Sequence, residues 1–151
     1  MFGFLKRKRQ SQQFEELVTQ RVQELACKLV PFLEMQTALL GATIPEIATS
    51  RHKAIKGYIF GLYDAAVIVA IDNGRLPPIR DGSLQAGAVQ HFYSMFLSES
   101  LASNSVDEAF SLMTDQEFAR GRQLGGDDYT NFLRTHGKSM PFGLRQIFHG
   151  R

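Results

Sequence analysis

The chain has 151 residues, of which 44% are hydrophobic, with 17 Lys and Arg, 15 Asp and Glu, and a single cysteine. This length predicts one domain, and one cysteine excludes an intramolecular disulfide and leaves a structural zinc site without its usual thiolate ligands. The N-terminal residues do not resemble a secretory signal, because the charges follow the apolar residues and no apolar run of about 7–15 residues is present. We therefore expect a cytoplasmic protein.

The positive charge is confined to the two ends of the chain. Residues 1–9 carry +4, and residues 134–151 carry +4 with no Asp or Glu. Residues 10–133 hold nine basic and fifteen acidic residues, so the middle has a net charge of −6. A nucleic-acid-binding domain usually has a basic patch across one face, so nucleic acid is an unlikely partner.

Residues 1–10 form a basic-apolar segment, which we expect to be mobile, and residues 11–151 a single helical domain. The residues of interest in the segment are Phe2, Phe4, Leu5, Lys6, Arg7, Lys8 and Arg9. Apolar rings beside several cations are typical of a contact with an anionic membrane. Two alternatives remain: the charges are only solvated, or they hold nucleic acid weakly and without sequence preference.

The first long helical pattern follows Ser11, with apolar residues at steps of three and four. Pro31 lies inside this pattern and predicts a kink or restart, since proline lacks the backbone N–H. Gly41 suits the end of this helix. Three sequences of capping-box type come later, Thr43 to Glu46, Ser105 to Glu108 and Thr114 to Glu117, and each predicts a helix start.

The most apolar stretch predicts a central helix over about residues 51–73. From residue 54 to 71 the only charged residues are Lys56 and Asp64, and apolar residues occupy every side of the helix. Such a helix is normally enclosed by other helices. Gly57, Gly61 and Ala65 form a row of small residues that would let a neighbouring backbone approach closely.

The second half of the chain predicts further helices over residues 83–103 and from residue 105. Another begins at Thr114, is broken at Gly125 and Gly126, and is followed by a short helix that Asp127 caps. The fold predicted for the whole chain is all-α: a single-domain bundle of six or seven helices around a buried central helix.

Asp64 is the main candidate for a ligand pocket, with His91 and Tyr63 as further candidates. A buried carboxylate needs a partner, and we expect a tyrosine hydroxyl, His91, Arg51 or Arg120. A structural link between helices is one interpretation of Asp64, and a ligand-binding role is the other.

No motif for catalysis or metal binding is present. No histidine pair has the i,i+4 spacing of a helical metal site, and His91 as a haem ligand has no support beyond its aromatic neighbours. We expect no catalytic residue, no metal and no cofactor. The favoured function is a non-enzymatic interaction module that binds a protein partner or its own copy and reaches membrane surfaces through its N-terminus. The alternatives are a small-molecule binder or enzyme with a pocket at Asp64, and weak nucleic-acid binding.

Overall fold

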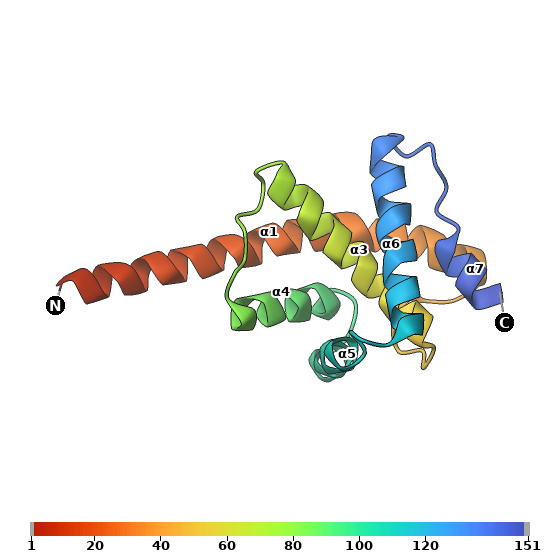
Figure 1. Ribbon diagram of the computed structural model, residues 1–151, viewed down its shortest axis with the longest axis horizontal. Coiled ribbons are helices and arrows are strands. Elements are labelled where there is room, and N and C mark those ends of the chain that lie inside the picture. The colour runs from red at the N-terminus through yellow and green to blue at the C-terminus, as the bar shows by residue number, and fades with distance from the viewer. Residues whose placement is uncertain (1, 150–151) are drawn as a thin grey trace.

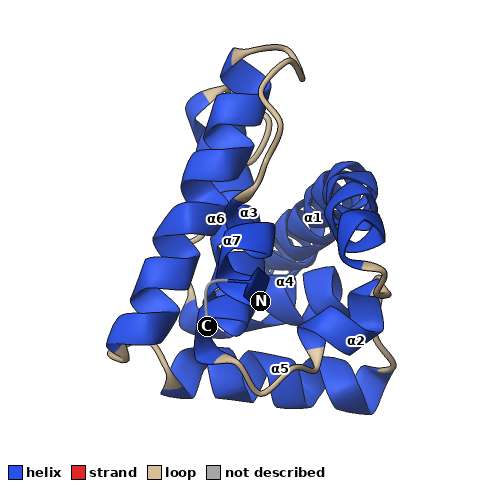
Figure 2. Cartoon of the chain, turned by 90° about the vertical axis from the view of Figure 1, so that its right-hand side faces the viewer, coloured by secondary structure: helices blue, strands red, loops and turns tan. Residues whose placement is uncertain are grey.

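The structure is a computed structural model that describes residues 2–149. Within this range it contains seven helices and no strand, which confirms the predicted all-α bundle (Figure 2). The helices are α1 (Phe2–Leu40), α2 (Ile44–Ala48), α3 (Lys53–Asp72), α4 (Gly82–Ser94), α5 (Glu99–Ser111), α6 (Gln116–Arg134) and α7 (Gly143–His149).

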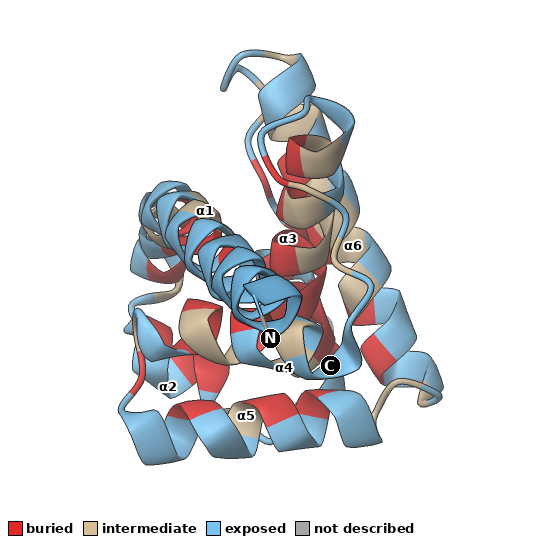
Figure 3. Cartoon of the chain, turned by 90° about the vertical axis from the view of Figure 1, so that its left-hand side faces the viewer, coloured by how far each residue is buried: buried red, intermediate tan, exposed pale blue. Residues whose placement is uncertain are grey.

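Helix α3 is the predicted central helix, and most of its first half is enclosed. Every residue from 57 to 63 is buried (Figure 3). Its most extensive contact is with α6, and it also packs against α1, α2, α5 and α7. The second half is less enclosed, because Ile68 is exposed and Val67 and Val69 are partly exposed.

Glycines bring α3 and α6 into backbone contact. A Cβ atom at Gly57 or Gly61 would overlap backbone of Phe118 or Arg122, and one at Gly125 would overlap the carbonyl oxygen of Tyr58. Gly121 faces backbone of α3 in the same way. The sequence predicted such a close approach for the glycine row of α3.

The predicted break at Gly125 and Gly126 is wrong. Helix α6 continues through both residues, although a glycine in a helix interior costs about 1 kcal/mol relative to alanine. The contact between the two backbones offsets this cost, because only glycine lets α6 lie directly against α3.

Helix α1 is longer than predicted, and the restart predicted near Pro31 is wrong, whereas a kink there stays a prediction. It begins at Phe2 instead of near Ser11, and it continues through Pro31, whose ring is on the exposed side. Its second half packs on the body through residues such as Val22, Leu29 and Leu33, whereas residues 2–17 are all exposed. The predicted mobility of residues 1–10 stays a prediction, with residue 1 outside the described range.

Of the three predicted capping boxes, only the first is present as expected. Thr43 and Glu46 bond each other's backbone N–H groups at the start of α2. Asp115, not Thr114, caps α6, because its carboxylate accepts from two backbone N–H groups.

Ser105 lies inside α5, so the second predicted box is wrong. The predicted single helix over residues 83–103 is also wrong, since α4 ends at Ser94 and α5 begins after Ser98. Ser98 has an extended backbone and accepts a bond from the N–H of Leu101, which starts the new helix.

A hydrogen-bond network joins α1, α6 and α7 to α3. The Tyr58 hydroxyl lies 2.6 Å from Oδ2 of Asp128 on α6 and 2.7 Å from the side-chain amide of Gln36 on α1. The same Asp128 oxygen accepts from the backbone N–H of Gly143 at 2.8 Å. One carboxylate therefore joins α3, α6 and the start of α7.

Helix α3 is the one described helix that is long and apolar enough to cross a membrane, with a mean hydropathy of 1.6 over its best stretch. The core helix of a water-soluble protein meets the same criterion, and 61% of this stretch is buried within the structure. Burial against α6 and α1 therefore accounts for the apolar composition of α3.

The glycine contact predicts opposite effects for two neighbouring substitutions. We expect Gly125→Ala to reduce the free energy of unfolding by about 1–3 kcal/mol or more, because the new methyl group overlaps the carbonyl of Tyr58. Gly126→Ala is the matched control: its Cβ would lie 3.7 Å from the nearest atom, so helix propensity makes it neutral or slightly stabilising. Urea unfolding of both variants measures the difference, and equal effects would contradict the backbone contact.

Candidate functional site

The N-terminal half of α1 is an arm that projects from the body along the longest axis of the molecule (Figure 1). We define the arm as residues 2–17, all of which are exposed. Phe2, Phe4 and Leu5 at its far end are 89%, 74% and 54% exposed. Large apolar side chains at such exposure, gathered at one end, are typical of an interaction surface.

The four cations of the arm surround the helix instead of lining one face. Successive residues of an α-helix are about 100° apart, so Lys6, Arg7, Lys8 and Arg9 point in four different directions. The arm is therefore not an amphipathic helix that would lie flat in a membrane. It has an apolar end, residues 2–5, followed by a cationic collar, residues 6–9. This order suits contact with an anionic surface end-on.

Asp64 occupies a half-exposed position on α3, and its partner is Arg122 of α6. The Arg122 Nη2 and Nε atoms donate to the same Asp64 oxygen at 2.6 and 3.1 Å. The Asp64 and Arg122 side chains are 34% and 38% exposed, so the pair lies at the edge of the core. The predicted partners of Asp64 were wrong: the guanidinium comes from Arg122, two residues beyond Arg120.

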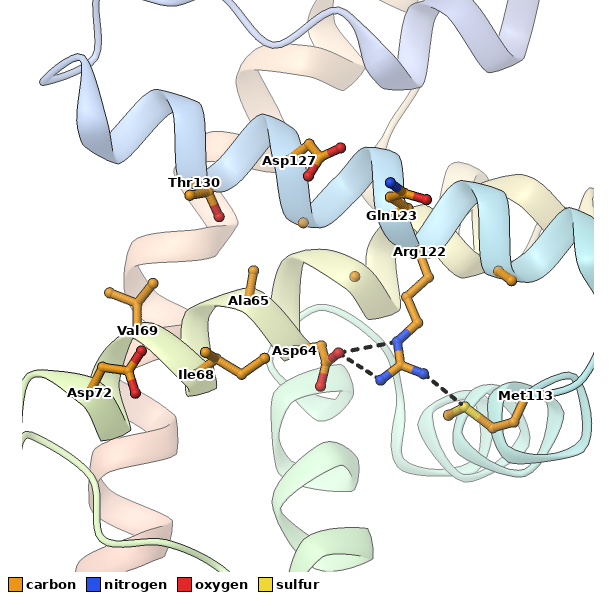
Figure 4. A pocket seen from close by; sticks show the side chains of 13 residues that line it. Asp64, Ala65, Ile68, Val69, Asp72, Met113, Arg122, Gln123, Asp127 and Thr130 are labelled. Carbon is orange, nitrogen blue, oxygen red and sulfur yellow. Dashed lines mark hydrogen bonds and ion pairs between the residues drawn. The ribbon is translucent and has the colours of Figure 1, made fainter.

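Two hollows meet at this ion pair. One is an open groove of about 550 Å³ between α3 and α6, with Ala65, Ile68 and Val69 along one side (Figure 4). The other is a more enclosed hollow of about 280 Å³ between α3, α4 and α5. Asp64 and Arg122 line both.

The enclosed hollow is mainly apolar and aromatic. Its apolar lining residues are Phe60, Tyr63, Val67, Ile71, Ile79, Val89, Phe110 and Met113. The Arg122 guanidinium lies 5.1 Å from the centroid of the Phe60 ring, and its Nη1 faces the Met113 sulfur at 3.5 Å. The walls are thus typical of a small-molecule pocket, with the ion pair and Gln85 as polar groups.

The structure brings together two of the three predicted pocket residues. Tyr63 and Asp64 line the same hollow, whereas His91 lines a depression between α1 and α4. Burial, with a smaller contribution from the Asp64 charge, raises the pKa of Tyr63. Tyr63 therefore stays protonated near neutral pH and is a hydrogen-bond donor rather than a general base.

The described residues contain no group of three or more His, Cys, Asp or Glu side chains that would hold a metal ion. Asp64 is paired with Arg122, and neither residue is next to a nucleophile such as a serine or cysteine in the hollow. The polar groups that line the hollow can donate and accept hydrogen bonds, and no serine or cysteine lines it.

Sequence analysis missed Arg122 and the second glycine row. Both follow from one signal: Gly121 and Gly125 have the same four-residue spacing as Gly57 and Gly61. Two such rows indicate a pair of helices in close contact, and Arg122 then lies beside α3. The Tyr58 to Asp128 contact spans seventy residues and had no local signal.

Comparison with protein-family models, with curated proteins and with solved structures gives no match to this chain. The functional assignment therefore rests on the geometry of the arm and of the hollow.

The exposure of the Asp64 to Arg122 pair predicts a small contribution to stability. We expect Asp64→Asn and Arg122→Met each to reduce the free energy of unfolding by about 1 kcal/mol or less, since solvent screens a half-exposed pair. A double-mutant cycle isolates the interaction between the two side chains. A loss of about 3 kcal/mol or more for either single variant would mean that the pair behaves as a buried one.

The raised pKa values of the buried tyrosines predict that the folded protein loses stability at high pH. Burial raises the pKa of Tyr58, Tyr63 and Tyr93 above the ordinary value of 10.0, and the Asp128, Asp64 and Glu108 charges add to the effect. Because the folded-state pKa is above the unfolded-state pKa, the stabilisation is complete below pH 10 and is lost as the pH rises further. Tyrosinate absorbance should appear together with the loss of helical circular dichroism. Ionisation of these tyrosines near pH 10 in an intact fold would contradict this prediction.

Proposed function

We propose that this protein is a non-enzymatic interaction module that associates with anionic membrane surfaces through its arm. The observation that supports this proposal best is the order of residues along the exposed helix: the apolar end with Phe2, Phe4 and Leu5, and then the cationic collar. A cytoplasmic location fits this function, because the cytoplasmic leaflet carries the anionic lipids.

The dimensions of the arm match the interfacial region of a bilayer. Residues 2–5 span about 6 Å along the helix axis, and amphipathic segments bury their apolar groups by about 5–10 Å. The collar then lies at the level of the headgroups, where each nearby cation adds about 1 kcal/mol. Apolar insertion and charge together give the two signals that stable membrane association needs.

The body provides the interaction function in this proposal. The groove between α3 and α6 exposes Ile68 beside the carboxylates of Asp72 and Asp127. A protein partner or a second copy with a basic and apolar surface fits this composition. The arm would then bring that partner to the membrane.

A small-molecule function at Asp64 is the second candidate. The enclosed hollow of about 280 Å³, with its apolar walls and one ion pair, supports it. A rise in melting temperature with a panel of small amphiphiles, lost in Phe110→Ala but kept in the collar variants, would favour this function over membrane association.

Vesicle flotation tests the membrane proposal. We expect binding to vesicles of phosphatidylcholine with phosphatidylserine, and weak binding to phosphatidylcholine alone. Replacing Phe2, Phe4 and Leu5 by serine, or the four collar cations by glutamine, should each weaken binding by at least about tenfold.

The matched control is Phe14→Ser with Leu17→Ser, which changes two exposed apolar residues of the same arm beyond the collar. This variant should bind as the native protein does. Binding that stays as strong as that of the native protein after loss of both the apolar end and the collar would overturn the proposal. Nucleic-acid binding, by contrast, would depend on the collar and on salt but not on Phe2, Phe4 or Leu5.

A further inference from the structure

The opposite end of the molecule has a second surface of the same chemistry. Met140, Phe142 and Phe148 are 46%, 46% and 36% exposed. Lys138 and Arg145 are exposed in the same segment. Residues 134–149 contain no Asp or Glu, so nothing in this stretch neutralises the cations. We name Lys138, Met140, Phe142, Arg145 and Phe148 the C-terminal surface.

Helix α7 presents part of this surface as one face. Arg145 and Phe148 are three residues apart, which places them on one side of the helix, and Phe142 lies directly before its first residue. Leu144 and Ile147 take the other side and are buried. Because those two residues already bury the inner side of α7, its aromatic and basic outer face is available to a partner.

The two surfaces lie at opposite ends of the longest axis. In Figure 1 the arm reaches the far left and α7 lies at the far right, and α1 runs between them. The last turns of α1 contact α7, so this single helix spans the distance. A helix of 39 residues is about 58 Å long.

The charge of the body disfavours contact of both surfaces with one flat membrane. Residues 10–133 carry −6, and an anionic bilayer repels them when the molecule lies on its side. Contact through the arm keeps the acidic body from that bilayer by more than the Debye length, which is about 8 Å at physiological ionic strength. The C-terminal surface is then held away from the first bilayer and is free to meet a second one.

We propose that the C-terminal surface is a second anionic-membrane contact and that the protein bridges two bilayers, with α1 as the spacer. This inference rests on the proposed membrane association of the arm. It adds a separate site, a separate lipid surface and a distance: the aqueous gap between bridged bilayers is about 60 Å, set by the length of α1.

Vesicle clustering separates bridging from simple binding. Vesicles of phosphatidylcholine with phosphatidylserine are mixed with the full chain, clustering is followed by dynamic light scattering, and the gap is measured by electron cryomicroscopy. The native protein should float with the vesicles, cluster them and hold them about 60 Å apart. The variant Phe142→Ser, Arg145→Glu, Phe148→Ser should still float but cluster vesicles at least about tenfold more slowly.

Two controls keep the result specific. Leu101→Ser removes an exposed apolar side chain of the body, 41% exposed, and should leave clustering unchanged. Circular dichroism checks that the triple variant keeps the native fold. The apolar-end variant of the arm should lose clustering and float only weakly, through the C-terminal surface.

The outcomes distinguish the two proposals. Native protein that does not float overturns the membrane function and the bridging together. Native protein that floats without clustering, or a triple variant that clusters normally, overturns the bridging alone. Sedimentation is the last check. If the native protein is a dimer and the triple variant is a monomer, the C-terminal surface binds a second copy of the chain. That result would also overturn the bridging proposal.

Discussion

The structure depends on the contact between the backbones of α3 and α6. Gly57 and Gly61 on one helix and Gly121 and Gly125 on the other face carbonyl groups of the opposite helix. Without side chains between them, the two helices come closer than leucine-lined helices can. This pair is the axis on which α1, α5 and α7 pack, and any added methyl group in it pushes against rigid backbone rather than against a movable side chain.

Polar links from α3 set how the other helices are placed around this axis. Lys53 pairs with Asp115 at the start of α6, Lys56 pairs with Glu108 of α5, and Asp64 pairs with Arg122. The Tyr58 hydroxyl adds the buried link to Asp128, which also holds the start of α7. Apolar packing alone is non-directional, whereas each of these contacts specifies one partner. The few polar groups of the most apolar helix therefore position its neighbours.

The two surfaces to which we assign the proposed membrane contacts lie outside this core and differ from it in charge. The core and the acidic middle of the chain form one body, and the basic and apolar groups gather on the arm and on the C-terminal surface. Helix α1 joins the two parts: its second half is packed on the body, and its first half extends away from it (Figure 1). Membrane association at one end, or at both, needs this separation, because cations distributed over the body would pair with its carboxylates.

The sequence by itself determined the helical class, the central helix, the close approach at its small residues and the charge segregation, because these are properties of periodicity and composition within short windows. It misplaced the boundaries at Ser105, Gly125 and Ser94, where tertiary packing outweighs local preference. It also placed Asp64 correctly near the core but gave it the wrong partner. Only the tertiary structure decided that Arg122 and Asp128 face α3 and that the two basic ends lie far apart. Those relations depend on how helices distant in sequence are arranged in space, and local sequence patterns do not encode that arrangement.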